Sequence, residues 1–135
     1  MKNYFYLILT FCVGIILFYA GCKDTISGNK LDNRTIPDSN VSFSQNILPV
    51  FIVKCTNSGC HDNETIAGGI SLTSWANTTA DPNVIFPGKP GNSSLVWAIE
   101  RQSNIQPMPP LGYPPLTPAQ IKGIITWIKE GAKDN

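Results

Sequence analysis

Two stretches of the chain carry apolar residues at three- and four-residue spacing, which is the spacing of one helical face. The first stretch consists of Phe43, Ile47, Val50 and Phe51. Either Ser42 or Ser44 can cap the start of this helix. Pro49 lacks a backbone donor, so we expect the first turn to be irregular or the helix to begin near Leu48. The pattern predicts a short helix that ends at or near Cys55.

The second stretch is the clearest helix in the sequence. Its apolar face contains Ile121, Ile124, Ile125 and Ile128, with Trp127 at one edge. Residues 117–120, Thr-Pro-Ala-Gln, have the pattern of a capping box with proline at the first helical position. Gly131 marks the end of the helix. We expect the apolar faces of the two helices to pack against each other.

The segment between these helices predicts short elements joined by long loops. Residues 68–69 are both glycine, which permits a tight turn or a close approach of the backbone to a ligand. Leu72 and Trp75 are expected to be core residues after that turn. Residues 81–92 are rich in proline and glycine and predict a loop. A short helix is expected from residue 92 or 93 through residue 101.

Composition narrows the class of protein. The chain has 135 residues, enough for one domain with appendages. Its formal net charge is +1, and the sequence lacks the clustered basic residues that a nucleic-acid surface needs. Only 14% of residues are charged, and the chain contains 11 Pro and 11 Gly. These values predict a compact, loop-rich domain without nucleic acid as a partner.

The N-terminal residues have the pattern of an export signal. Lys2 is followed by an uncharged, mostly apolar run over residues 4–20, and the run ends in Ala-Gly before Cys22. We predict that residues 1–21 are a lipoprotein-type signal peptide and that Cys22 carries the lipid. Tyr19 stands where such signals usually have Leu. An uncleaved membrane anchor and plain secretion are the alternatives, and all three place the domain outside the cytoplasm.

A polar segment separates the signal from the domain. Residues 22–40 show no apolar periodicity and are expected to form the lipidated cysteine and a flexible tether. Residues 41–135 then form the folded domain. The sequence therefore predicts a bacterial lipoprotein anchored to a membrane, in the periplasm or at the cell surface.

The candidate chemistry is concentrated in the segment Cys55-Thr56-Asn57-Ser58-Gly59-Cys60-His61. Two thiols followed directly by a histidine are typical of covalent haem attachment, in which His ligates the iron. The usual spacer between the cysteines has two residues, and here it has four. Thr56 to Gly59 are turn-forming residues that can loop outward.

Three other structures could use the same cysteines. They could form a disulfide loop in an oxidising compartment. They could bind zinc with His61, although Asp62 or Glu64 would then have to complete the site. They could form a redox-active dithiol, although the spacing of such motifs is absent.

Met108 is the best candidate for a second iron ligand. The only His is in the motif, and the only other Met is Met1. Met108 lies in the segment Gln106-Pro107-Met108-Pro109-Pro110, and prolines make such a loop stiff. The alternative is a methionine that fills a surface gap. Lys89 and Arg101 could pair with haem propionates, but the sequence favours solvent-exposed charges at both positions.

The order of several short blocks resembles the planctomycete-type cytochrome c domain over about residues 42–133. The blocks are Phe43-Ser44, Ile47-Leu48-Pro49-Val50-Phe51, Gly68-Gly69-Ile70-Ser71-Leu72, Pro87-Gly88-Lys89-Pro90, Ser94-Leu95, Met108-Pro109-Pro110 and Trp127-Ile128 with Gly131-Ala132. The four-residue spacer departs from the family, which commonly has two residues there. The resemblance implies one covalent haem c, thioethers at Cys55 and Cys60, and iron ligation by His61 and Met108. It also implies an all-α cytochrome c-like fold of about three to four short helices, with long loops around one haem.

These observations together predict an electron carrier rather than an enzyme. The expected function is that of a single-haem c-type cytochrome that exchanges electrons with redox partner proteins at a membrane surface. One alternative is a haem-free interaction module on a lipid anchor, stapled by a disulfide or holding a metal. Another is a haem-based sensor or enzyme for a small ligand, if Met108 can be displaced.

Overall fold

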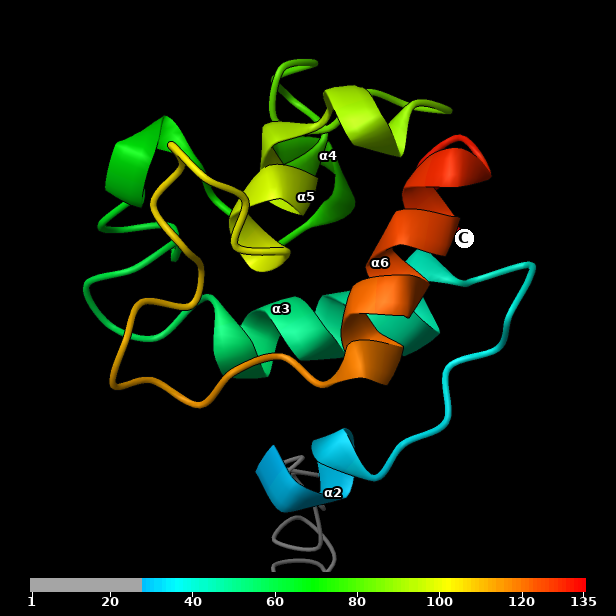
Figure 1. Cartoon of the computed structure of the whole chain (residues 1–135), viewed down its shortest axis with the longest axis horizontal. Coiled ribbons are helices and arrows are strands. Elements are labelled where there is room, and N and C mark those ends of the chain that lie inside the picture. Colours follow the sequence, from blue (N-terminus) through cyan, green and yellow to red (C-terminus); the bar gives the residue numbers. More distant parts are fainter. Residues whose placement is uncertain (1–27) are drawn as a thin grey trace, which may run out of the picture.

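The computed structural model describes residues 28–135, and this part of the chain is built of short helices joined by loops (Figure 1). The helices, in order, are α2 (Gly28–Asp32), the π-helix η1 (Phe43–Ile47), α3 (Leu48–Lys54), the 3-10 turn η2 (Ala67–Gly69), α4 (Trp75–Thr78), the 3-10 turn η3 (Pro90–Asn92), α5 (Ser94–Ile99) and α6 (Pro118–Lys129). No strand occurs among the described residues. The expected all-α, loop-rich fold is confirmed. Within residues 28–135, no helix is both long and apolar enough to cross a membrane.

The irregular helix start predicted from Pro49 is present. Ser42 caps the first turn, because its hydroxyl accepts a hydrogen bond from the Gln45 amide at 3.2 Å. The chain then makes one π-helical segment, and the regular helix α3 begins at Leu48. Pro49 thus falls in the first turn of α3. The helix ends at Lys54, and Cys55 is its C-cap.

Helix α6 packs across η1, as the two apolar stretches predict. Its capping box between Thr117 and Gln120 is present, with hydrogen bonds in both directions. The rings of Phe43 and Trp127 lie 5.2 Å apart, centroid to centroid. Trp127 was expected at the edge of the apolar face, but it is fully buried, and its indole N–H donates to the Lys133 carbonyl at 2.9 Å. This partner allows the indole to occupy the centre of the core.

The inward face of α6 is therefore rotated from the expected one. The buried positions on this helix are Gln120, Gly123, Ile124, Trp127 and Ile128. Ile121 and Ile125 are only partly buried and lie at the margin of the core. The apolar pattern predicted Ile121 and Ile125 as inward positions. Gln120 is inward instead, and its side chain has a hydrogen-bond partner there.

Residues 28–40 do not form the flexible tether that the sequence indicated. Leu31 of α2 is 2% exposed and belongs to the core. Ile36 lies so close to Gly123 that a Cβ at that glycine would be 2.7 Å from its Cγ2 atom. Two isolated apolar residues give no periodic pattern, which is why the sequence did not reveal this packing. The predicted signal peptide and Cys22 lie outside the described residues.

The middle of the chain follows the expected order. Leu72 is buried, and the Trp75 indole packs on the core and donates to the Ala132 carbonyl at 2.7 Å. Helix α5 is shorter than predicted, and Ser93 does not cap it with its side chain. The buried Ser93 hydroxyl instead accepts from the Phe86 amide at 2.9 Å and so holds the preceding loop. The two long loops, residues 55–74 and 100–117, lie together at one end of α3 and α5 (Figure 1).

Candidate functional site

The segment between the two cysteines folds back on itself at the end of α3. The Cys55 amide donates to the Phe51 carbonyl at 2.8 Å and so continues the helical pattern. The Cys60 amide donates to the Asn57 carbonyl at 2.9 Å, and the His61 amide donates to the Cys55 carbonyl at 3.1 Å. Gly59 has φ 85°, which only glycine adopts easily. The longer spacer is thus a closed turn that returns the second thiol and the histidine to the first thiol.

A second turn begins directly after His61 and is held by the Asp62 side chain. The carboxylate accepts hydrogen bonds from the Thr65 amide at 2.6 Å and from the Glu64 amide at 2.8 Å. These bonds hold the pKa of Asp62 below its ordinary value. The carboxylate is therefore hydrogen-bonded within its own turn and is not available to a metal ion beside the cysteines.

The imidazole of His61 is held in one tautomer. Its Nδ1 lies 3.2 Å from the Ile70 carbonyl oxygen, and since a carbonyl only accepts, Nδ1 carries the hydrogen. The other ring nitrogen, Nε2, then keeps its lone pair for a ligand bond. The backbone supports this arrangement, because the Leu72 amide donates to the His61 carbonyl at 2.9 Å. Histidines that ligate metals are usually oriented by such a bond on the second nitrogen.

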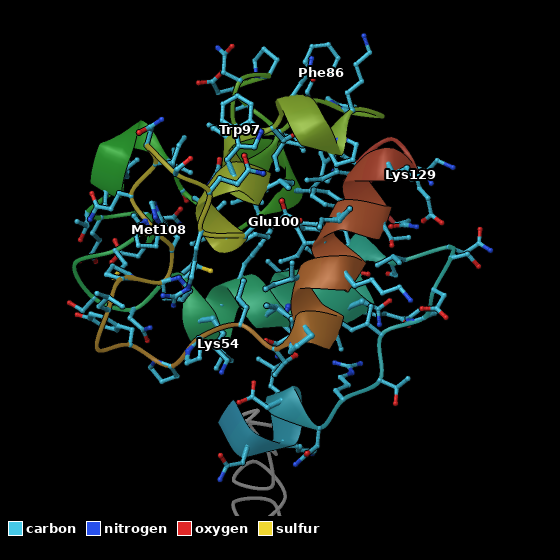
Figure 2. All side chains as sticks on the ribbon, viewed as in Figure 1. Lys54, Phe86, Trp97, Glu100, Met108 and Lys129 are labelled. Atoms are coloured by element: carbon cyan, nitrogen blue, oxygen red, sulfur yellow. The ribbon has the colours of Figure 1, made fainter. Side chains whose placement is uncertain are left out.

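Met108 is held by the end of α5. Its amide donates to the Ala98 carbonyl at 3.0 Å, and the following Pro109 is buried. Figure 2 shows Met108 on the same side of the molecule as Lys54, at the C-terminal end of α3. The loop thus approaches the end of α3 from above in this view and brings the thioether to the cysteine turn.

All four predicted haem residues line one cavity. This cavity has a volume of about 380 Å³ and is lined by Cys55, Cys60, His61 and Met108 among others. A second cavity of about 190 Å³ shares His61, Ile70, Gln106 and Met108 with the first. The two cavities are therefore neighbours, with the imidazole and the thioether at their common boundary. Most of the remaining wall is apolar, and the pair has the size typical of a small-molecule or cofactor site, about 300–1,000 Å³.

The chemistry of these side chains fits a covalently attached haem. Cys55 and Cys60 are both free thiols, so no disulfide closes the turn. Burial, together with the neighbouring Cys60, raises the pKa of the Cys55 thiol to about 12. Such a thiol is protonated at neutral pH, which disfavours a redox-active dithiol. Within residues 28–135, no cluster of three or more His, Cys, Asp or Glu side chains is placed to hold a metal ion.

The structure adds one charged residue to the site that the sequence did not indicate. Lys54 lines the larger cavity and is only 7% exposed. Neither of the two basic residues considered from the sequence lines the cavities: Lys89 lies over the Phe86 ring at 5.1 Å, and Arg101 is exposed. A lysine in the last turn of a helix normally extends into water, and only the packing of Asp32 against Lys54 reveals that this one is buried.

Gly68 is also part of the site, as the glycine pair suggested. It lines the larger cavity and has φ 64°. The space beside its Cα is open, so the glycine is required by backbone conformation rather than by crowding.

Comparison with known families gives one match. Residues 58–112 match the family described as Planctomycete cytochrome C. The comparisons with curated proteins and with solved structures gave no match. The matched segment contains Cys60, His61 and Met108, and Cys55 lies just before it. The match confirms the resemblance drawn from the sequence, and a domain of this family implies haem binding and fits an electron carrier.

Proposed function

We propose, on the premise that residues 58–112 are the centre of a planctomycete-type cytochrome c domain, that the protein is a single-haem c-type cytochrome that carries electrons. One observation supports this most strongly. Met108 is far in the sequence from the segment that holds Cys55, Cys60 and His61, yet all four side chains line one cavity with mostly apolar walls. No other group of residues in the described part of the chain combines two free thiols, an imidazole and a thioether.

Each of the four side chains has a distinct role in this proposal. Cys55 and Cys60 would attach the porphyrin through thioethers, and the closed turn between them fixes the distance between the two sulfurs. His61 would ligate the iron through Nε2, because Nδ1 is engaged with the Ile70 carbonyl. Met108 would be the second ligand. A bound haem supplies one-electron chemistry, in which the iron gains or loses one electron while its ligands stay in place.

The proposed location is outside the cytoplasm. The signal pattern of residues 1–21 and the cysteine at position 22 support a lipid anchor in a bacterial membrane. Attachment of haem to paired cysteines takes place in the same compartment. The proposed partners are redox proteins that meet the domain at the membrane surface.

The test is a reduced-minus-oxidised absorption spectrum of full-length protein made together with a haem-attachment system. We expect a sharp c-type band that survives acid-acetone extraction, and an intact mass increased by one haem. Cys55→Ser/Cys60→Ser is the control and should lose the covalent haem. A wild-type protein without haem under these conditions would refute the proposal, and intact mass would then show whether a disulfide had formed.

A second variant tests the methionine ligand. Met108→Ala should keep the covalent haem, because both cysteines remain, but it should lose the low-spin spectrum and bind added cyanide or carbon monoxide readily. If the wild-type protein already bound these ligands as readily, Met108 would not be a firm ligand. The protein would then fit a ligand sensor better than an electron carrier.

A further inference from the structure

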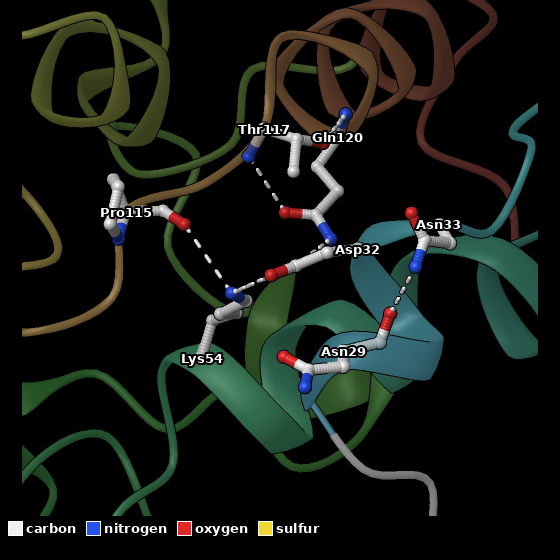
Figure 3. A network of polar contacts seen from close by, with 7 residues as sticks. All are labelled: Asn29, Asp32, Asn33, Lys54, Pro115, Thr117 and Gln120. Carbon is white, nitrogen blue, oxygen red and sulfur yellow. Dashed lines mark hydrogen bonds and ion pairs between the residues drawn. The ribbon is translucent and has the colours of Figure 1, made fainter.

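A partly buried ion pair adjoins the haem cavity on the side of α3. The Lys54 ammonium lies 2.8 Å from Asp32 Oδ1 and 3.0 Å from Asp32 Oδ2, and 3.4 Å from the Pro115 carbonyl (Figure 3). The Lys54 side chain is 4% exposed, and that of Asp32 is 35% exposed. Lys54 lines the cavity and directly precedes Cys55, whereas Asp32 does not line it. Lys54 is therefore the member of the pair that belongs to the cavity wall.

Asp32 is itself fixed by a second partner. Its carboxylate accepts a hydrogen bond from the Gln120 side chain at 3.0 Å, and Gln120 is 1% exposed. The Gln120 carbonyl oxygen in turn accepts from the Thr117 amide at 2.9 Å (Figure 3). The hydrogen bond from Lys54, and then that from Gln120, lower the pKa of Asp32, so the carboxylate is ionised at neutral pH. One carboxylate thus joins α2, the end of α3 and the start of α6.

This pair lies outside the segment that matches the family. The matched segment begins at residue 58, so both Asp32 and Lys54 precede it. The packing of α2 on the domain brings Asp32 to Lys54, which lines the cavity.

We infer that Asp32 is a positioning residue, which holds and partly neutralises the Lys54 charge at the cavity wall and so helps to set the reduction potential of the haem. The inference rests on the proposed function. A positive charge beside the haem stabilises the reduced state, which holds one more electron, and so raises the potential. The effect persists at physiological salt, because Lys54 is shielded from solvent.

The test uses two single variants with opposite expected shifts. Asp32→Asn keeps the size of the side chain but leaves the Lys54 charge uncompensated, so the midpoint potential should rise. Lys54→Met keeps the apolar stem but leaves the Asp32 charge, so the midpoint potential should fall. The double variant is neutral and should return toward the wild-type value. All potentials are measured on the haem-loaded full-length proteins at one pH and one salt concentration.

Two controls separate charge from shape. Asp32→Glu keeps the carboxylate and should stay near the wild-type potential. Lys122→Met removes the cation of an ion pair with Asp38 that is short, 2.6 Å, but exposed, at 66% and 82% of the two side chains. This variant should leave the potential unchanged, because neither residue lines the cavity and water screens both charges.

The opposite signs make the result decisive. A general loosening of the fold would shift both single variants in the same direction, and that result would overturn the inference, as would unchanged potentials in both. If Asp32→Asn yields no haem-loaded protein, Lys54→Met decides alone: a lowered potential supports the inference, and a raised or unchanged one refutes it. Absence of haem from the wild-type protein would refute the proposed function instead, so the two failures are distinguishable.

Discussion

The two halves of this small domain are stabilised in different ways. In the helical half, η1, α3 and α6 bury Phe43, Phe51, Trp127 and several isoleucines almost completely. In the loop half, residues 55–74 and 100–117 surround the cavities and leave large apolar side chains in solvent, with Leu111 80% and Tyr113 50% exposed. The helical half forms a complete packed core, whereas the loop half surrounds the cavities. The comparison indicates that the loop half depends on its cofactor more than the helical half does.

Removing the haem tests the comparison between the two halves most directly. In Cys55→Ser/Cys60→Ser, amides of the loop half should exchange with deuterium more than about tenfold faster than in the loaded protein, a local loss of about 1.4 kcal/mol. The amides of α6 should change much less, because the buried face of that helix is closed without the cofactor. Hydrogen exchange resolved by mass spectrometry measures both. Equal loss of protection in the two halves would show that the haem supports the whole domain.

Trp127 is the best position at which to destabilise the helical half. Trp127→Ala should lower the free energy of unfolding of the loaded protein by about 3–5 kcal/mol, because the indole is fully buried against Phe43. Denaturant titration followed by circular dichroism gives the value. Trp97→Ala serves as the matched control, since this half-buried indole lies on α5 and bonds only to the Gly91 carbonyl. A similar loss for both variants would mean that the core is not concentrated at α6.

The junction of α2 with the domain should depend on pH through Asp32. Its folded pKa is lowered, so the ion pair contributes stability above the ordinary aspartate pKa of about 3.9 and loses it as the pH falls through the folded value. At pH 7, Asp32→Asn should lower the free energy of unfolding by about 1–2 kcal/mol. This loss is smaller than that from breaking a fully buried ion pair, because the Asp32 side chain is 35% exposed. The cost should vanish at the lowest pH at which the protein remains folded. A cost that did not change between these pH values would assign the effect to something other than charge.

The smallest effect is expected on the loop side. Leu111→Ser should change the free energy of unfolding by less than about 0.5 kcal/mol, because the side chain is 80% exposed. Thermal unfolding of the loaded protein measures this. Leu116→Ser in the same loop is the contrasting variant, since Leu116 is 7% exposed and should cost more. A large loss at Leu111 would reveal packing that the exposed position does not predict.

The sequence predicted the structure best where a residue type favours one local backbone conformation. The capping box at Thr117 and Gln120, the break before Leu48 and the glycine turn at Gly68 follow from backbone chemistry, and all three are present. The gathering of the cysteine turn and Met108 could be expected from the ligands that a haem iron needs and from the family resemblance, but not from periodicity, because the residues are so far apart.

Other features depend on contacts that no local pattern encodes. The docking of α2 uses Leu31, Ile36 and one ion pair, and none of these stands out in a polar segment. The burial of Lys54 requires Asp32, twenty-two residues earlier in the chain. Trp127 reaches the centre of the core because the Lys133 carbonyl accepts its N–H, a partner beyond the end of the helix.

The docking of α2 would also limit how far the domain could travel from the lipid anchor proposed at Cys22. If the domain began at Val41, nineteen residue steps would separate it from the lipid, with a maximum reach of about 68 Å. Because Gly28 already belongs to the docked segment, only six steps remain, and these cover at most about 22 Å. This limit is smaller than the diameter of a domain of this size, whose radius of gyration is about 13 Å. A lipidated form would therefore meet its electron donors and acceptors within a thin layer at the bilayer, where encounter is governed largely by lateral diffusion.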